Sequence, residues 1–423
     1  MMTSVSTTRP TPPAVYILAA GVFALVTSEF AVAGLMPQLA EGLGTDLTRI
    51  GYLVTIFALA MAVGGPILTV LLTRVAPKSA LLTVIAIFLV GNVLAAAAPS
   101  YAVMVVARVI SGVASQAFFG LALSLCSRLV AEDMRGRAIG VVMNGLTLGT
   151  LLGLPLETFV GGHWGWRAAF WIISAITVVA AALIAAFVHV SGASVEDSMP
   201  AATRATVLRR PHLLLAFASS TLIIGATFAA FSFFTPILTE VSGFSVGVVP
   251  LLLLAYGAAT LIGNIVVARL ADRRTIPTML VGTGLNALFL LGFAVFAGVP
   301  AVAVLFMIGI GFVGVTMNPA MAVRVQREGD TSPLVNTVHA SFITLGVIIG
   351  SAVGSALIPT FGLRAPIVLG VVLAVAALLT IAPALARRPV SSVASSAGTH
   401  SAPAAPPARR TVPAEPCATT GSR

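Results

Sequence analysis

Charged residues are scarce in this sequence. Asp, Glu, Lys and Arg make up only 9% of its 423 residues, whereas 58% are hydrophobic. A typical soluble domain carries about 25% charged residues. Because the shortage extends over most of the chain, it excludes an ordinary soluble protein and indicates a surface solvated by lipid.

Paired cysteines, catalytic groupings and nucleotide-binding motifs are also lacking. The two cysteines, Cys126 and Cys417, lie far apart and form no CxxC or Cys/His spacing, which argues against a disulfide framework and a metal site. The apolar segments hold no paired Asp and no Ser/His pair, and no Gly-rich loop ends in Lys. We therefore expect neither an enzyme nor an ATP-driven pump.

The sequence does contain apolar runs of about 20 residues, the length of a helix that crosses a membrane. Charges, Gly and Pro separate twelve such runs. They predict helices at 14–36, 48–72, 79–98, 102–128, 136–160, 167–189, 212–238, 246–270, 277–297, 301–324, 333–358 and 364–386.

Polar segments flank and divide these runs. We interpret 1–13 as a disordered N-terminus, 190–211 as a linker and 387–423, rich in Ala, Pro, Ser and Thr, as a disordered tail. The first apolar run is too long for the core of a signal peptide, so we interpret it as the first membrane helix. The helical halves are then 14–189 and 212–386.

The basic residues indicate how the chain is oriented. Twelve crossings place both termini on one side of the membrane. If that side is the cytoplasm, 19 Lys and Arg residues lie inside and only Arg49, Arg167 and Arg364 outside, while Arg108 falls within a span. This bias fits the positive-inside rule and predicts cytoplasmic termini. It also explains the net charge of +10 without a nucleic-acid partner.

The two halves repeat each other. A shift of 199 residues pairs Pro37 with Pro236, Glu41 with Glu240, Gly44 with Gly243, Gly64 with Gly263 and Arg74 with Arg273. A shift of 197 pairs "WGWRAAF" (164–170) with "FGLRAPI" (361–367). We therefore predict an all-α membrane protein of twelve transmembrane helices in two pseudo-symmetric six-helix halves. Such repeats are typical of secondary transporters with a site between the halves.

Several motifs resemble those of the major facilitator superfamily, specifically its bacterial twelve-helix drug/proton antiporters. The resemblance covers about 14–386. The motifs are "TSEFAVAGLMPQLAEGL" (27–43), "ARVISGVASQAFFG" (107–120), "EDMRGRAIG" (132–140), "GLTLGTLLGLP" (145–155) and "GNIVVARLADRR" (263–274). The first is similar to a subgroup that includes chloramphenicol-resistance exporters and relatives implicated in sugar or nucleoside efflux.

The resemblance implies that certain motif positions govern conformational change. These are Gly145, Gly149, Gly153, Pro155, Arg135, Arg137, Asp272 and Arg273. The chain departs from the family pattern at two places. Thr73 stands where the repeat has Asp272, and Glu157 follows the fifth-helix motif where a glycine is usual. The four-residue spacing of the three glycines favours close helix packing.

Three charges fall deep within the predicted spans: Glu29, Arg108 and Glu157. Charges in such places are costly and usually mark a transport pathway. At about 1.5 Å per residue all three lie in the outer half of the membrane. We assign them to proton coupling, because burial favours a neutral carboxyl whereas a nearby guanidinium favours the carboxylate. The alternatives are a static ion pair, an arginine that caps the carbonyls of a broken helix, and a Glu29 that remains protonated. For Glu157 they are a substrate contact and a charge that reaches the outer interface beside His163.

The expected substrate contacts are weaker predictions. Small and polar residues follow Arg108 at helical spacing, and phenylalanines gather in the fourth and seventh helices. The candidates are Ser111, Ser115, Gln116, Phe119, Phe231 and Phe234. Ordinary packing explains such residues almost as well. Asn318-Pro319 predicts a kink in the tenth helix, and His339 either relays protons or packs through a hydrogen bond.

These features predict a proton-coupled transporter that exports small, largely apolar, chloramphenicol-like molecules by alternating access. An alternative is sugar or nucleoside efflux by the same fold, and a remote one is a membrane receptor or intramembrane enzyme. We expect a monomer in the lipid bilayer with a small-molecule substrate, no nucleic-acid partner, no metal, and no cofactor other than the proton gradient.

Overall fold

The computed structural model describes residues 12–72, 74–131, 134–188, 210–329 and 333–384. Within that part the chain is all helical, and twelve helices are long and apolar enough to cross a membrane. The predicted fold class is confirmed. The predicted N-terminal segment 1–13 and linker 190–211 fall almost wholly outside the described residues, and the tail 387–423 does so entirely.

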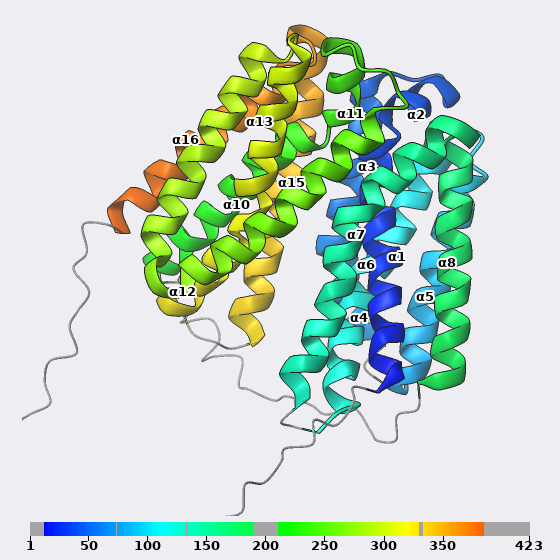
Figure 1. The fold of residues 1–423 in the computed structure, drawn as a ribbon. Coiled ribbons are helices and arrows are strands. Elements are labelled where there is room, and N and C mark those ends of the chain that lie inside the picture. Colours follow the sequence, from blue (N-terminus) through cyan, green and yellow to red (C-terminus); the bar gives the residue numbers. More distant parts are fainter. Residues whose placement is uncertain (1–11, 73, 132–133, 189–209, 330–332, 385–423) are drawn as a thin grey trace, which may run out of the picture. The chain divides into compact units, whose positions relative to one another are not determined.

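The spans match the predicted apolar runs to within a few residues at most ends (Figure 1). The elements of the first half are α1 (Pro13–Gly34), α2 (Met36–Gly42), α3 (Leu47–Leu59), η1 (Ala60–Gly64), α4 (Gly65–Leu71), α5 (Pro77–Ala96), α6 (Tyr101–Arg128), α7 (Arg135–Trp164) and α8 (Trp166–Phe187). Those of the second half are α10 (Pro211–Phe231), α11 (Phe234–Pro236), η3 (Ile237–Val241), α12 (Val249–Phe296), α13 (Pro300–Val313), η4 (Val315–Met317), α14 (Asn318–Glu328), α15 (Pro333–Phe361), α16 (Ala365–Ile381) and η5 (Ala382–Ala384). α12 contains two spans, divided where Arg274 leaves helical geometry.

The predicted end of the seventh helix, at 238, is wrong, because α10 ends at Phe231. α1 ends at Gly34, two residues before its predicted end. Leu35 (φ −106°, ψ 13°) and Phe233 (φ −116°, ψ 12°) interrupt the two helices in nearly the same conformation. Hydrophobic content alone does not detect such a break, because the residues beyond it are also apolar.

The internal repeat reappears in the backbone and in side-chain contacts. Gly44 and Gly243, 199 residues apart, have φ of 59° and 74°, and Gly165 and Gly362, 197 apart, have φ of 81° and 74°. Only glycine adopts this left-handed region readily. Both halves also join their first and third spans through an asparagine: Ser28 Oγ donates to Asn92 Oδ1 at 2.7 Å, and Asn286 Nδ2 donates to Thr227 Oγ1 at 3.3 Å.

α7 packs along α1 through its glycines (Figure 1). A Cβ at Gly145 would overlap the backbone of Ala19, one at Gly149 would lie 2.7 Å from Val26 Cβ, and one at Gly153 would lie 3.0 Å from Thr27 Cα. The two backbones therefore approach closely along most of the length of α1. This packing holds Glu157, four residues beyond Gly153, near the part of α1 that carries Glu29.

Replacement of Gly145 by Ala tests this packing. We expect Gly145→Ala to destabilise the protein by about 1–3 kcal/mol, because the new methyl group meets backbone rather than a flexible side chain. Thermal unfolding in detergent measures the change. Gly140 is the matched control on the same helix, because a Cβ there meets nothing within 4 Å. Equal unfolding temperatures for Gly145→Ala and Gly140→Ala would contradict this account.

The two halves belong to one compact unit, Met1–Ala386, and they touch between the middle and the outer ends of their spans. Outer here means the end opposite the termini. Thr55 of α3 and Ser351 of α15 share a hydrogen bond of 2.8 Å. Gly257 of α12 lies against Leu151 of α7, where a Cβ would come within 2.9 Å of the Leu151 carbonyl oxygen.

Candidate functional site

Arg108 lies on α6 and is fully buried. Its Nη1 donates to the Ser28 carbonyl at 2.8 Å, its Nη2 donates to the Glu29 carbonyl at 3.2 Å, and its guanidinium lies 4.0 Å from the centroid of the Phe57 ring. The guanidinium binds backbone carbonyls, as one alternative held, but the helix that supplies them is not broken at these residues. A carbonyl in a continuous helix can accept this second bond because its oxygen has two lone pairs.

Glu29 lines a small cavity where α1 and α3 meet α10 and α15. The wall is mostly aromatic and aliphatic: it consists of Phe30, Ala33, Val54, Phe57, Ala58, Phe228, Phe231, Ser232 and Val347. Phe30 packs edge-on to Phe231, with ring centroids 5.3 Å apart. The Oγ of Ser232 is buried and has no hydrogen-bond partner among the described residues. The cavity therefore has one ionisable residue in an apolar surround.

Glu157 is the more enclosed of the two deep glutamates. Its side chain is 2% exposed, and neither carboxyl oxygen has a hydrogen-bond partner in the described structure. Arg108 interacts electrostatically with both Glu157 and Glu29, but it forms an ion pair with neither within the described residues. Both carboxyls thus lie within the field of one guanidinium whose bonds go to the backbone of α1.

The enclosure of Glu157 predicts a stabilising substitution. Glu157→Met removes two buried oxygens without partners and keeps a similar volume, so we expect it to raise the free energy of unfolding by about 1–3 kcal/mol. Thermal unfolding in detergent measures the gain. Glu41→Met, at an exposed glutamate, is the control and should leave the unfolding temperature nearly unchanged. A lower unfolding temperature for Glu157→Met would show that its carboxyl has a stabilising partner.

The predicted substrate-contact residues of α6 lie in contacts between helices and not at the Glu29 cavity. Ser111 Oγ donates to the Ala107 carbonyl of its own helix at 2.8 Å, and Gln116 packs where a Cβ on Gly65 would lie. Ser115 is buried on the same helix. Together with Gly112, which abuts the Phe57 carbonyl, this face of α6 lies against a neighbouring helix rather than the Glu29 cavity.

The predicted aromatic residues lie nearer the site. Phe231 lines the Glu29 cavity. Phe234 supports it from behind, with its ring centroid 5.8 Å from Phe231 and 5.2 Å from Tyr256. Phe119 is half-buried and packs on the core.

Of the remaining motif residues, Pro155 lies on the same helix as Glu157 and the three arginines are exposed. Pro155 is buried within α7, which continues through it to Trp164. Arg135, Arg137 and Arg273 are exposed. The side chain of Asp272 lies outside the described residues.

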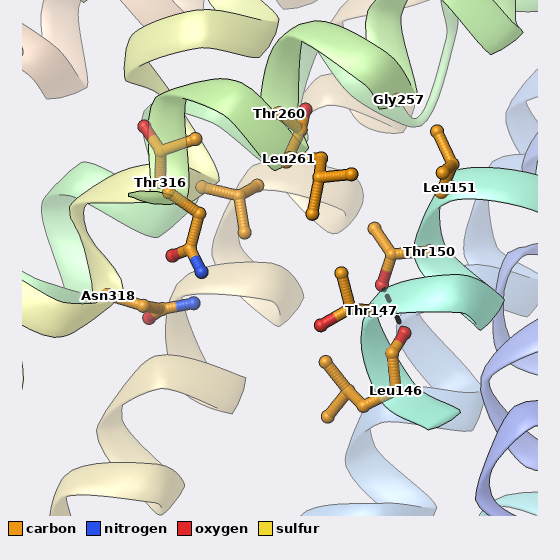
Figure 2. Close-up of a pocket in the computed structure, with 11 residues that line it drawn as sticks. Leu146, Thr147, Thr150, Leu151, Gly257, Thr260, Leu261, Thr316 and Asn318 are labelled. Carbon is orange, nitrogen blue, oxygen red and sulfur yellow. Dashed lines mark hydrogen bonds between the residues drawn. The ribbon is translucent and has the colours of Figure 1, made fainter. Parts of the chain in front are cut away.

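A second cavity was missed from the sequence (Figure 2). It lies between α7 of the first half and α12, η4 and α14 of the second. Its lining residues are Leu146, Thr147, Thr150, Leu151, Gly257, Thr260, Leu261, Asn264, Val315, Thr316 and Asn318. The predicted kink at Asn318-Pro319 is the nearest signal for it. The helix in fact breaks earlier, at Gly314 (φ −77°, ψ −95°), and the η4 turn that follows forms part of the wall.

Arg324, one of the 19 basic residues assigned to the inner side, is buried to 4% exposure, with Nη1 donating to Ser219 Oγ at 2.9 Å. His339 is also buried, and its Nε2 bonds Ser220 Oγ at 2.9 Å. Both partners, Ser219 and Ser220, are serines of the apolar helix α10. The sequence shows these serines but does not indicate which residues they contact.

Twelve spans in two repeated halves, with ionisable groups and cavities where the halves meet, define a multi-pass membrane transporter. Residues 18–338 match the model of the Major Facilitator Superfamily, and the chain belongs to this family of transporters, which is not an enzyme family. It is 31% identical over 362 residues to the uncharacterized MFS-type transporter YtbD of Bacillus subtilis, covering 83% of this chain and 90% of the relative. It is 31% identical over 345 residues to a chloramphenicol resistance protein of Streptomyces lividans, covering 81% and 87%.

Among solved structures, the fold is similar to a bacterial homologue of the human lysosomal transporter Spinster in an inward-facing and occupied conformation. The TM-score is 0.72 at 16% identity, covering 90% of this chain and 98% of the other. At this identity the likeness concerns the fold alone.

Proposed function

We propose that this protein is a proton-coupled exporter of small molecules, including chloramphenicol-like compounds. The observation that carries the proposal is the position of Glu29. Glu29 lines an aromatic cavity between the two halves, and its own backbone carbonyl accepts from the buried Arg108. A carboxyl so placed can exchange a proton and contact a substrate at the same point, which is what coupling requires.

The contacts between the halves supply the mechanism. They run from the middle to the outer ends of the spans, through Thr55–Ser351 and Gly257–Leu151. We propose that this is the state closed towards the outside, and that rocking of one half against the other separates these contacts and exposes Glu29. Release of substrate then accompanies uptake of a proton from outside.

The proposal includes the setting of the protein. Both termini lie in the bacterial cytoplasm, the chain acts as a monomer in the bilayer, and the proton gradient is its sole energy source, with no metal, further cofactor or nucleic-acid partner. The alternative substrates, sugars and nucleosides, fit the same fold. The cavity of Figure 2, which threonines and asparagines help to line, supports sugars and nucleosides as the second candidate substrates.

An uncoupler tests the proposal directly. In a pump-deficient bacterium that expresses the protein, we expect low accumulation of chloramphenicol. When a protonophore collapses the gradient, accumulation should rise to the level of cells without the protein, because no other energy source drives export. The control compares the same cells with their ATP supply restored while the protonophore is present. Continued export under these conditions would overturn proton coupling.

A further inference from the structure

Phe233 lies just beyond the end of α10, and its ring is fully buried. Its backbone has left helical geometry (φ −116°, ψ 12°), and the next residue, Phe234, begins the short helix α11. Phe234 packs within the second half, with its ring centroid 5.2 Å from Tyr256 and 5.6 Å from Phe293 of α12. The break in the helix directs the ring of Phe233 to other partners, one of which belongs to the first half.

Two glycines from opposite halves lie against this ring. A Cβ on Gly51 of α3 would come within 3.0 Å of Phe233 Cε1, and one on Gly354 of α15 would come within 3.0 Å of Phe233 Cε2. The two ring edges therefore contact different halves. At these distances neither position has room for a methyl group unless the ring moves. The ring fills the space that the two absent side chains leave.

The contact continues along α3 and α15. A Cβ on Gly51 would also overlap Ser355 Oγ, and one turn further inward Thr55 and Ser351 share their hydrogen bond of 2.8 Å. Gly51 and Thr55 are four residues apart, as are Ser351 and Ser355, so each pair lies on one face of its helix. Phe233 therefore occupies the outer end of a contact that joins the two halves.

The internal repeat does not impose this ring on the first half. The shift of 199 residues places Gly34 opposite Phe233, and the shift of 197 places Glu157 opposite Gly354. The large and the small residue have thus exchanged helices between the halves. Where the second half has an aromatic ring at the end of its first span, the first half has a buried carboxyl on its fifth span. The contact of Phe233 across the halves is specific to one half.

We propose that Phe233 is a positioning residue that holds the outer side closed, because its ring is seated between Gly51 and Gly354. When the halves separate at their outer ends, Gly51 leaves with the first half and the ring loses one of its two walls. Re-exposure of a buried aromatic ring is costly, so this fit favours the closed state. The inference rests on the rocking motion of the proposed function and adds a residue that sets its equilibrium.

The test compares variants that disturb the fit from opposite sides of the contact. Phe233→Ala removes the ring and leaves a cavity, whereas Gly51→Ala adds a methyl group that meets the ring and Ser355. Both should destabilise the closed state more than the open one, because Gly51 and the ring are apart once the halves separate. Phe233→Leu keeps part of the apolar volume and serves in place of Phe233→Ala if that variant does not fold.

The measurement is the distance between spin labels on the two halves, obtained by double electron–electron resonance. The labels are attached at Glu41→Cys and Thr360→Cys, exposed positions near the outer ends of α2 and α15. The full-length protein, with Cys126 and Cys417 replaced by alanine, is measured in lipid nanodiscs with neither substrate nor gradient. We expect a longer distance in each variant, with the ratio of open to closed molecules raised at least about tenfold over the parent.

Phe170→Ala and Gly91→Ala are the matched controls, because each makes the same kind of change within the first half. Phe170 is fully buried beside Trp166, with ring centroids 6.3 Å apart. A Cβ on Gly91 would lie 2.8 Å from the backbone nitrogen of Ser111. Both controls should lower the unfolding temperature and leave the distance between the labels unchanged.

Three results would overturn the proposal: unchanged distances in folded variants of both Phe233 and Gly51, a shift in only one of the two, or an equal shift in the controls. The first would show that the ring does not set the equilibrium. The second would show that the fit across the halves is not the cause, and the third that any loss of packing opens the outer side. The outcome is separable from that of the proposed function, because the labels report opening without substrate or gradient, whereas the protonophore experiment reports coupling.

Discussion

Arg108→Lys should reduce export to the level of cells without the protein, although it keeps the positive charge. The guanidinium donates through separate nitrogens to the carbonyls of Ser28 and Glu29 while its plane lies over Phe57. An ammonium is a point donor on a flexible stem and does not reproduce this geometry. α1 would then lose one of its charge-assisted bonds, each contributing about 1.5–3 kcal/mol. We expect a lower unfolding temperature together with the loss of chloramphenicol export.

Arg167 supplies the control for this substitution. It too lies over an aromatic ring, 4.1 Å from the centroid of Trp166, and donates to a backbone carbonyl, that of Ala98, at 3.0 Å. Arg167 is exposed near the start of α8, however, where water can replace its hydrogen bonds at little cost. Arg167→Lys should therefore export normally. Normal export by Arg108→Lys would show that charge alone suffices at this position.

The fold was largely predictable because its causes are local and periodic. Apolar runs of membrane length need no knowledge of tertiary contacts, and each of the twelve was found. The repeat was also readable, because turns such as those at Gly44 and Gly243 require glycine at fixed places in both halves. Helix breaks were less predictable. Leu35, Phe233 and Gly314 depart from helical geometry within apolar sequence, where packing determines the backbone.

The sequence identified the charged residues of the site but did not predict which hydrogen bonds they form. Glu29, Arg108 and Glu157 stand out because charge is costly in hydrocarbon. Their arrangement depends on the side of α1 that faces α6 and α7, which spacing along one helix does not determine. Opposite charges suggested an ion pair, yet Arg108 binds carbonyls, which every residue possesses and no sequence distinguishes. The threonine cavity escaped notice for a similar reason, because its members come from helices more than a hundred residues apart.

Glu29→Gln should abolish proton-coupled export while leaving the protein folded. Glutamine has nearly the shape of glutamate and fits the same cavity beside Phe30 and Phe231, but it has no proton to release. The backbone carbonyl of residue 29 still accepts from Arg108, so the packing of α1 on α6 persists. In proteoliposomes with an imposed pH gradient, we expect chloramphenicol uptake driven by the gradient to fall to that of empty vesicles. Exchange of labelled for unlabelled chloramphenicol without a gradient should continue.

Continued exchange would assign Glu29 to proton coupling, because substitution of a glutamate with a purely structural role would abolish exchange and gradient-driven uptake together. Glu41→Gln is the matched control. Glu41 lies on the next helix, α2, and is exposed, so the variant should show normal gradient-driven uptake. Glu157→Gln in the same assay shows whether the second buried carboxyl shares the proton. If Glu29→Gln alone retains gradient-driven uptake while Glu157→Gln loses it, the proton is carried on α7, and the Glu29 cavity is left with substrate contact as its function.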